Sequence, residues 1–252
     1  MIPKIIHFCW LSGEEYPQLV KDCLKSWKKH MPEYEVVCWN MEKIADIDNQ
    51  YMREAISCRK WAFAADFIRF YALYNYGGIY LDSDVFVRSS LEKLSGHRAF
   101  SGIEYCISTK ERICNIEAAV VGAEPQHPLI NDCLNAFNNR KFILGGGNFD
   151  QKIIPEIVAE IAESKYGFKR IPESQLLHED VMIYSPDIIA HAYLESSSAK
   201  DCCAIHLCAG GWYKSSVSKW SRAKSLIRRL LKNPVNTIYM LYWKLRFGKE
   251  MK

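Results

Sequence analysis

The spacing of apolar residues along the chain predicts alternating strands and helices over its first third. Residues 4–10 form a short apolar run that is typical of a buried strand, and residues 18–30 repeat apolar positions at helical spacing. A second strand is expected at residues 34–39. Residues 60–76 then predict a long helix, and residues 79–81 the strand that follows it.

A pair of glycines, Gly77 and Gly78, separates that long helix from the next strand. Glycine readily adopts the left-handed backbone conformation found at helix ends, so the helix should stop there. The pattern is weaker further along the chain, where we expect strands near residues 99–103, 118–122, 181–184 and 203–206, and helices near residues 128–138 and 151–165. Alternating strands and helices predict an α/β fold with a mostly parallel central sheet.

The pattern changes after Trp212, where apolar residues at helical spacing alternate with basic ones. Residues 214–252 hold eleven Lys and Arg but a single acid, Glu250, although the whole chain has a net charge of only +4. Pro234 is expected to begin a second helix within this stretch. The sequence therefore predicts one catalytic domain at residues 1–213 and a basic amphipathic helical tail at residues 214–252, whose partner is anionic.

The composition, 49% hydrophobic and 25% charged over 252 residues, excludes a disordered protein. The apolar runs are shorter than the roughly 20 residues of a membrane-spanning helix. Residues 1–11 lack the features of a signal peptide. Ten cysteines without an export signal are expected to be reduced thiols. These features predict a cytoplasmic globular protein.

Two carboxylates stand close together where the strand at residues 79–81 ends. Asp82 and Asp84 are separated only by Ser83, and ligands bind at the carboxyl ends of strands in open α/β sheets. Mn²⁺ or Mg²⁺, which prefer hard oxygen ligands, would neutralise this pair and also bind phosphate oxygens. The alternative is a solvated surface turn, which a bare Asp-x-Asp motif also allows.

Asp66 and Arg69 place two charges in an otherwise apolar helix. They lie three residues apart and therefore share a helix face. Buried charges are costly unless they are paired or used. The two residues therefore either bind a ligand or form an ion pair that satisfies only itself.

Three stretches of the chain together resemble one family of DXD-containing sugar transferases. The stretches are IPKIIHFCW at residues 2–10, ADFIRFYALYNYGGIYLDSD at residues 65–84, and AIHLCAGGW at residues 204–212. The family, glycosyltransferase family 32-like, includes fungal outer-chain mannosyltransferases and bacterial capsular polysaccharide transferases, and it is distantly similar to glucosylating toxin domains. The resemblance implies a Rossmann-like GT-A fold, a nucleotide-sugar donor, a divalent metal and retention of the anomeric configuration.

The resemblance also implies roles for individual residues. Asp82, Asp84 and His206 are expected to ligate the metal, and Asp66, Arg69 and Asp84 to form the catalytic group. The expected nucleotide-sugar contacts are Phe8, Trp10, Asp66, Arg69, Tyr80, Asp82, Ser83 and Trp212.

Some of these residues have an ordinary structural explanation as well. Trp10 could pack in the core, and His206 could be a satisfied histidine at a strand end. Gly211 stands where the family usually has serine, which removes a hydroxyl near the donor phosphate. His178 and the two acids after it could supply an acceptor-side carboxylate, but a solvated loop explains them equally well.

The sequence thus predicts a metal-dependent retaining glycosyltransferase. It would move a hexose from a nucleotide-diphosphate sugar, UDP-linked rather than GDP-linked, to a saccharide or lipid-linked oligosaccharide in bacterial capsule, lipopolysaccharide or exopolysaccharide synthesis. Residues 214–252 would bind an anionic membrane surface, on the inner face of the cytoplasmic membrane, and no nucleic acid. The alternatives are a nucleotide-sugar hydrolase, a protein-modifying transferase and, given the basic tail, a nucleic-acid-binding protein.

Overall fold

The computed structural model describes residues 1–106, 113–191 and 201–208. At its centre is an eight-stranded sheet in the order β10-β11-β5-β7-β3-β1-β2, with β6 paired to β5. These strands are β1 (Ile5–Cys9), β2 (Glu35–Trp39), β3 (Gly78–Leu81), β5 (Ala99–Cys106), β6 (Ile113–Ile116), β7 (Val120–Ala123), β10 (Gln175–Leu177) and β11 (Val181–Tyr184). Only β6, β7 and β10 run against the other strands of this sheet. The expected α/β class with a mainly parallel sheet is confirmed.

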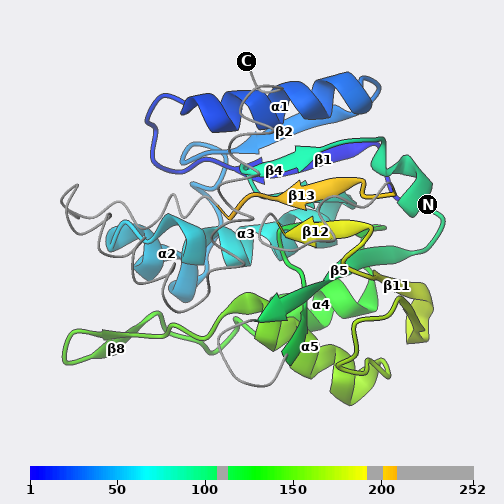
Figure 1. Cartoon of the computed structure of the whole chain (residues 1–252). Helices are drawn as coiled ribbons and strands as arrows, with labels where there is room; N and C mark the ends of the chain where they lie inside the picture. Colours follow the sequence, from blue (N-terminus) through cyan, green and yellow to red (C-terminus); the bar gives the residue numbers. More distant parts are fainter. Residues whose placement is uncertain (107–112, 192–200, 209–252) are drawn as a thin grey trace, which may run out of the picture.

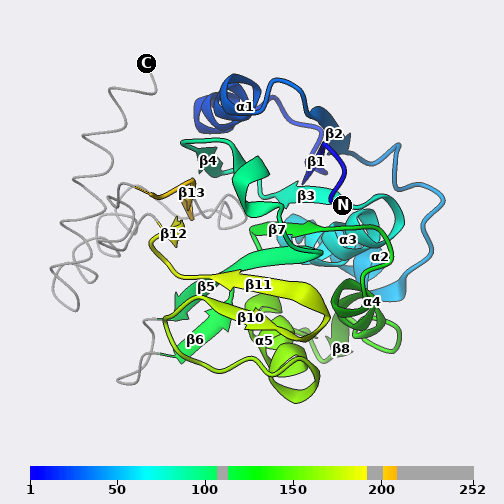
Figure 2. The ribbon, with the colours of Figure 1, turned by 90° about the vertical axis from the view of Figure 1, so that its right-hand side faces the viewer.

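Further elements cover both faces of the central sheet (Figures 1 and 2). One face carries α1 (Gln18–His30) and a small sheet of β12 (Ile189–His191), β13 (Ala204–His206) and β4 (Val85–Val87). The other face carries α2 (Gln50–Ser57), α3 (Trp61–Tyr76), α4 (Pro128–Asn135) and α5 (Ile154–Lys165). A hairpin of β8 (Ile143–Gly145) and β9 (Asn148–Phe149) projects beyond α2 (Figure 1), and two short 3₁₀ helices are η1 (Leu91–Leu94) and η2 (His178–Asp180).

The alternation of side chains along β1 and β3 divides the apolar residues between two cores. Ile6 and Phe8 of β1 pack toward α1, as do Ile79 and Leu81 of β3. Tyr80, between the last two, packs instead among the residues of α3. The end of β3 is therefore buried on both faces, which fixes the position of the acidic motif that follows it.

The helix end predicted at Gly77 and Gly78 is confirmed. α3 ends at Tyr76, and the two glycines have φ angles of 63° and 101°. A Cβ atom on Gly77 would come within 2.6 Å of Pro125 Cδ, and one on Gly78 within 2.6 Å of Ile5 O. Because only glycine fits at these positions, α3 can turn directly into β3. The charged face of the helix and the acidic end of the strand thereby become neighbours.

Several elements differ from the sequence-based expectation. The strand expected at residues 118–122 begins only at Val120, since residues 117–119 form a turn after β6. α2 and β4 were not predicted, because both are short, and β4 pairs with β13, a strand far along the chain. Among the described residues, no helix has both the length and the apolar character needed to cross a membrane. Trp212 and the predicted tail at residues 214–252 lie outside the described residues.

Candidate functional site

The Asp82-Ser83-Asp84 motif forms a tight connection between β3 and β4. The backbone N–H of Asp82 donates to Ala119 O at 2.9 Å, and the N–H of Val85 donates to Asp82 O at 2.9 Å. From the other side, the indole N–H of Trp27 in α1 donates to Val85 O at 2.8 Å. The motif is thus held between the central sheet and α1.

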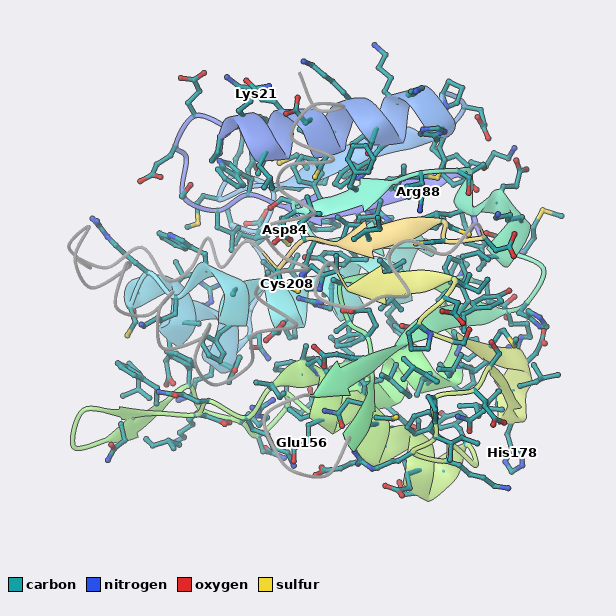
Figure 3. All side chains as sticks on the ribbon, in the orientation of Figure 1. Lys21, Asp84, Arg88, Glu156, His178 and Cys208 are labelled. Carbon is teal, nitrogen blue, oxygen red and sulfur yellow. The ribbon has the colours of Figure 1, made fainter. Side chains whose placement is uncertain are left out.

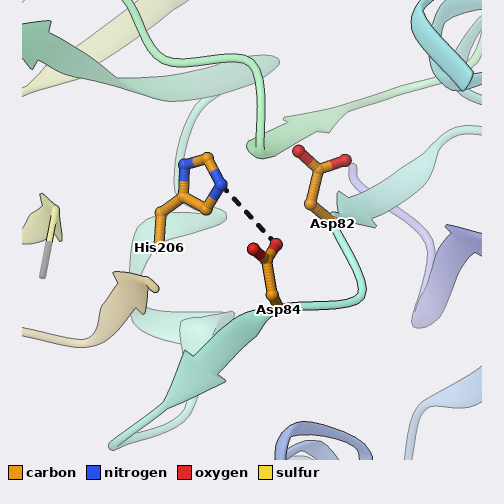
Figure 4. Close-up of side chains that lie close together, drawn as sticks. All are labelled: Asp82, Asp84 and His206. Atoms are coloured by element: carbon orange, nitrogen blue, oxygen red, sulfur yellow. Dashed lines mark ion pairs between the residues drawn. The ribbon is translucent and has the colours of Figure 1, made fainter. Parts of the chain in front are cut away.

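His206 reaches this motif through the small sheet. β13 pairs antiparallel with β4, which places His206 opposite Val85, and the N–H of Leu207 donates to Asp84 O at 3.0 Å. His206 Nε2 lies 3.6 Å from Asp84 Oδ1 (Figure 4). One ligand atom from each of Asp82, Asp84 and His206 fits within 4.8 Å of the other two. Two carboxylates and an imidazole thus converge from strands more than 120 residues apart in sequence.

This donor set fits a divalent cation. Carboxylate oxygens are the preferred ligands of Mg²⁺ and Mn²⁺, and an imidazole nitrogen favours the transition metal of the two. The three side chains are half-buried, so they keep access to solvent and to a ligand. The three residues that the sequence analysis expected as metal ligands therefore lie together.

Arg69 links Asp66 to the acidic motif. Its Nη2 donates to Asp66 Oδ1 at 2.8 Å and to Asp82 Oδ1 at 3.4 Å, and its Nη1 donates to Ala118 O. The guanidinium also stacks over the Tyr80 ring, 4.8 Å from its centre. Arg69 is only 4% exposed. The ion pair between Asp66 and Arg69 thus exists, but it extends into the motif instead of satisfying only itself.

Burial and this network act in opposite directions on the acids. Burial raises the pKa of Asp66 to about 7, although the Arg69 guanidinium opposes the shift. Burial also raises the pKa of Asp82, again against Arg69. The pKa of Arg69 itself is raised, because the surrounding acids outweigh its burial. Arg69 therefore stays charged and supplies the positive charge of this acidic cluster.

Acidic neighbours surround His206 as well. Burial alone would lower its pKa, but Cys208, Glu117 and Asp84 outweigh that effect and raise the pKa well above its ordinary value. Asp84 and its acidic neighbours thus create a negative potential at His206. Such a potential attracts a cation.

The other expected donor contacts have different surroundings. Trp10 follows β1, so it lies at the same sheet edge as Asp82; its indole N–H donates to Glu14 O at 2.7 Å, and its half-buried ring packs on Tyr16. Ser83 is half-buried. Tyr80, expected as a nucleotide or sugar contact, is only 1% exposed, and its hydroxyl donates to Asp82 Oδ1 at 3.1 Å.

Phe8, also expected at the donor, is 3% exposed and packs edge-on against Trp27 in the core. Both side chains are therefore buried: Phe8 packs in the core, and Tyr80 hydrogen-bonds the carboxylate of Asp82.

The polar cluster around His178 lies far from the acidic motif (Figure 3 labels His178 and Asp84). Its acids bind neighbouring side chains: Asp180 Oδ1 lies 2.7 Å from His97 Nδ1, and Glu179 Oε2 accepts from Arg98 at 2.8 Å. An acceptor-side role for this cluster therefore has no support in the geometry.

Sequence reasoning missed one acid at the site, Glu117. It is 1% exposed, and its Oε1 lies 3.5 Å from His206 Nδ1. Nothing in the local pattern marks it, because it lies in the turn between β6 and β7. Only the placement of β13 beside β4 brings it to His206.

Residues 17–101 match the family described as "Glycosyltransferase sugar-binding region containing DXD motif". The matched stretch includes α3 and the Asp82-Ser83-Asp84 motif. Residues 17–101 are therefore similar to the DXD sugar-binding region of glycosyltransferases. The resemblance found in the sequence is thereby confirmed.

Proteins similar to this chain come from fungi, a virus and a plant. Inositol phosphoceramide mannosyltransferase 3 of Schizosaccharomyces pombe is 35% identical over 103 residues, which are 39% of this chain and 29% of that protein. Uncharacterized glycosyltransferase L373 of Acanthamoeba polyphaga mimivirus is 29% identical over 141 residues, 52% of this chain and 53% of that protein. The chain thus spans about half, or less, of the length of these relatives.

Among solved structures, a glycosyltransferase involved in glycosylation of the major capsid of PBCV-1 is similar with a TM-score of 0.44 and 13% identity. The similarity covers 83% of this chain and 95% of that one.

Proposed function

We propose that this chain is a divalent-metal-dependent GT-A glycosyltransferase that transfers a hexose, with retention of configuration, from a nucleotide-diphosphate sugar. The observation that carries the proposal is the convergence of Asp82, Asp84 and His206 at the end of β3, inside and beside the matched DXD region. These three residues would hold the cation. When bound, it would neutralise charge on a diphosphate leaving group.

The remaining residues of the site position this acidic group. Arg69 holds Asp82 through its guanidinium, and Tyr80 holds the same carboxylate through its hydroxyl. Asp66 is the more exposed member of its ion pair, with 14% of its side chain accessible against 5% for Arg69. Asp66 is therefore the member of the pair that would accept hydrogen bonds from sugar hydroxyls and so select the donor.

The donor nucleotide and the acceptor are part of the proposal. A UDP-linked hexose is the expected donor, and a saccharide or lipid-linked oligosaccharide of bacterial surface polysaccharide the expected acceptor. The S. pombe relative is named as a mannosyltransferase of inositol phosphoceramide. GDP-mannose and a glycolipid acceptor are therefore the alternatives that a donor and acceptor screen must include.

A donor screen tests the function. The full chain is incubated with Mn²⁺ and UDP-glucose, UDP-galactose, UDP-N-acetylglucosamine or GDP-mannose, and the released nucleoside diphosphate is measured by mass spectrometry. We expect release from one donor, abolished by EDTA and reduced at least about 100-fold by Asp84→Asn, because a lost charge-stabilising group costs that much. Asp46→Asn, at an exposed aspartate, is the matched control. Equal turnover by Asp84→Asn and wild type would refute the proposal.

Membrane attachment through residues 214–252 also belongs to the proposal, and the charge of this stretch supports it. Sedimentation of the full chain with vesicles tests it. We expect pelleting with vesicles that contain phosphatidylserine but not with phosphatidylcholine alone, and release at high salt, because salt screens the attraction. Equal pelleting with both kinds of vesicle would contradict an electrostatic attachment.

A further inference from the structure

Glu117 is a carboxylate that the structure buries beside the candidate metal site. Its side chain is 2% exposed, and it lies in the turn between β6 and β7. Its backbone N–H donates to Gly102 O at 2.8 Å, and its own carbonyl accepts from Ser101 Oγ. Burying a carboxylate is costly, so its position calls for a partner.

One of its partners is the ring of His206, which lies between two carboxylates. On one side, Nε2 is 3.6 Å from Asp84 Oδ1, and on the other, Nδ1 is 3.5 Å from Glu117 Oε1. A carboxylate beside one ring nitrogen of a histidine favours the proton on that nitrogen, so Asp84 and Glu117 compete for the ring proton until a cation at Asp82 and Asp84 takes the place of the proton on Nε2. With the proton on Nδ1, the lone pair of Nε2 is available on the side of Asp82 and Asp84.

The turn that carries Glu117 is attached to the DXD motif. Ala119 donates its N–H to Glu117 Oε1 at 2.8 Å, and its carbonyl accepts from the N–H of Asp82 at 2.9 Å. Arg69 donates to the carbonyl of Ala118, between the two. One short segment therefore fixes both the backbone of the motif and the carboxylate that faces His206.

We propose that Glu117 is a positioning residue that holds the ring of His206 so that Nε2 faces a cation at Asp82 and Asp84. This inference rests on the proposed function. In it Glu117 acts through His206 and is not itself a ligand. Removing its charge should therefore weaken cation binding only while His206 is present.

A double-mutant cycle tests the inference. Mn²⁺ binding to the full chain is measured by electron paramagnetic resonance for wild type, Glu117→Gln, His206→Ala and the double variant. The carbonyl oxygen of a glutamine can still accept from Ala119, so Glu117→Gln removes the charge and keeps the turn. We expect Glu117→Gln to weaken Mn²⁺ binding about 10- to 100-fold in the wild-type background, as for other partners of metal-bound histidines. In the His206→Ala background, the loss should be less than about threefold.

Each other outcome has a definite meaning. Equal losses in the two backgrounds would overturn the inference, because Glu117 would then bind or attract the cation directly. Unchanged Mn²⁺ binding by folded Glu117→Gln would overturn it as well. Wild-type protein that transfers sugar without binding Mn²⁺ would instead overturn the metal dependence in the proposed function. Should Glu117→Gln not fold, ¹⁵N spectra of Mg²⁺-saturated wild type decide: His206 protonated at Nδ1 supports the inference, and at Nε2 overturns it.

Discussion

His7 in β1 and His206 in β13 show that the groups around a histidine determine its role. His7 lies inside β1 and is 2% exposed; its Nε2 lies 2.8 Å from Gly77 O, and its Nδ1 accepts from the indole N–H of Trp39 at 3.2 Å. The neutral ring satisfies both contacts, with Nε2 donating. His206 has a carboxylate beside each ring nitrogen instead.

The difference separates a structural histidine from one suited to a cation site. At His7 a second proton would place two N–H groups, those of Nδ1 and Trp39, against each other. Burial also lowers the pKa of His7, whereas the acidic neighbours of His206 raise the pKa of that residue. Both residues end or interrupt apolar runs in the sequence. Only the surrounding groups distinguish them.

Exchanging each histidine for alanine should give opposite results, and this is the largest effect we expect. At a Mn²⁺ concentration of 100 times the wild-type Kd, bound metal should stabilise wild type by about 2.7 kcal/mol. His206→Ala should lose this Mn²⁺-induced gain. His7→Ala should keep it, but its free energy of unfolding without metal should fall by about 2–4 kcal/mol, because it loses buried hydrogen bonds and leaves a cavity. Denaturant unfolding with and without Mn²⁺ measures both quantities.

The contrast between the two histidines would be wrong if His7→Ala and His206→Ala responded to Mn²⁺ in the same way. If Mn²⁺ stabilised His206→Ala as much as wild type, His206 would not be a ligand of the proposed cation. Loss of the Mn²⁺-induced gain in His7→Ala would show that β1 and β13 are coupled, because in the described part of the chain His7 hydrogen-bonds Gly77 and Trp39 and not the acidic motif.

The parts of the fold that the sequence predicted are those whose signal is local. β1, α1, α3 and the glycine turn after α3 each follow from apolar spacing or from a residue with special backbone freedom. β4 was missed. Its three residues carry little pattern, and its partner β13 lies more than 115 residues further along the chain. Pairing over that distance leaves no local trace.

The same division holds at the site. The spacing of Asp66 and Arg69 allowed an ion pair as one of two possibilities, and Asp82 and Asp84 are close because only Ser83 separates them along the chain. That Arg69 also reaches Asp82 and the carbonyl of Ala118 depends on how α3 packs against the sheet. Glu117 depends on two long-range pairings at once, so no pattern in the sequence could have indicated it.

The smallest effect we expect is the pH dependence that His7 adds to stability. The pKa of His7 in the folded protein is below its ordinary value of 6.5, so the unfolded chain binds more protons between the two values. The contribution of His7 to the free energy of unfolding is therefore fully present above pH 6.5. It is lost as the pH falls below that value, by at most about 1.4 kcal/mol per pH unit.

The difference between wild type and His7→Gln isolates this contribution, because every other titrating group, including buried His127 and half-buried Asp66, is present in both proteins. Denaturant unfolding in EDTA should give a difference that is constant above about pH 7 and changes below it in favour of the glutamine variant. A pH-independent difference at position 7 would mean that the buried ring accepts a second proton. His7 would then resemble His206, and the contrast between the two histidines would fail.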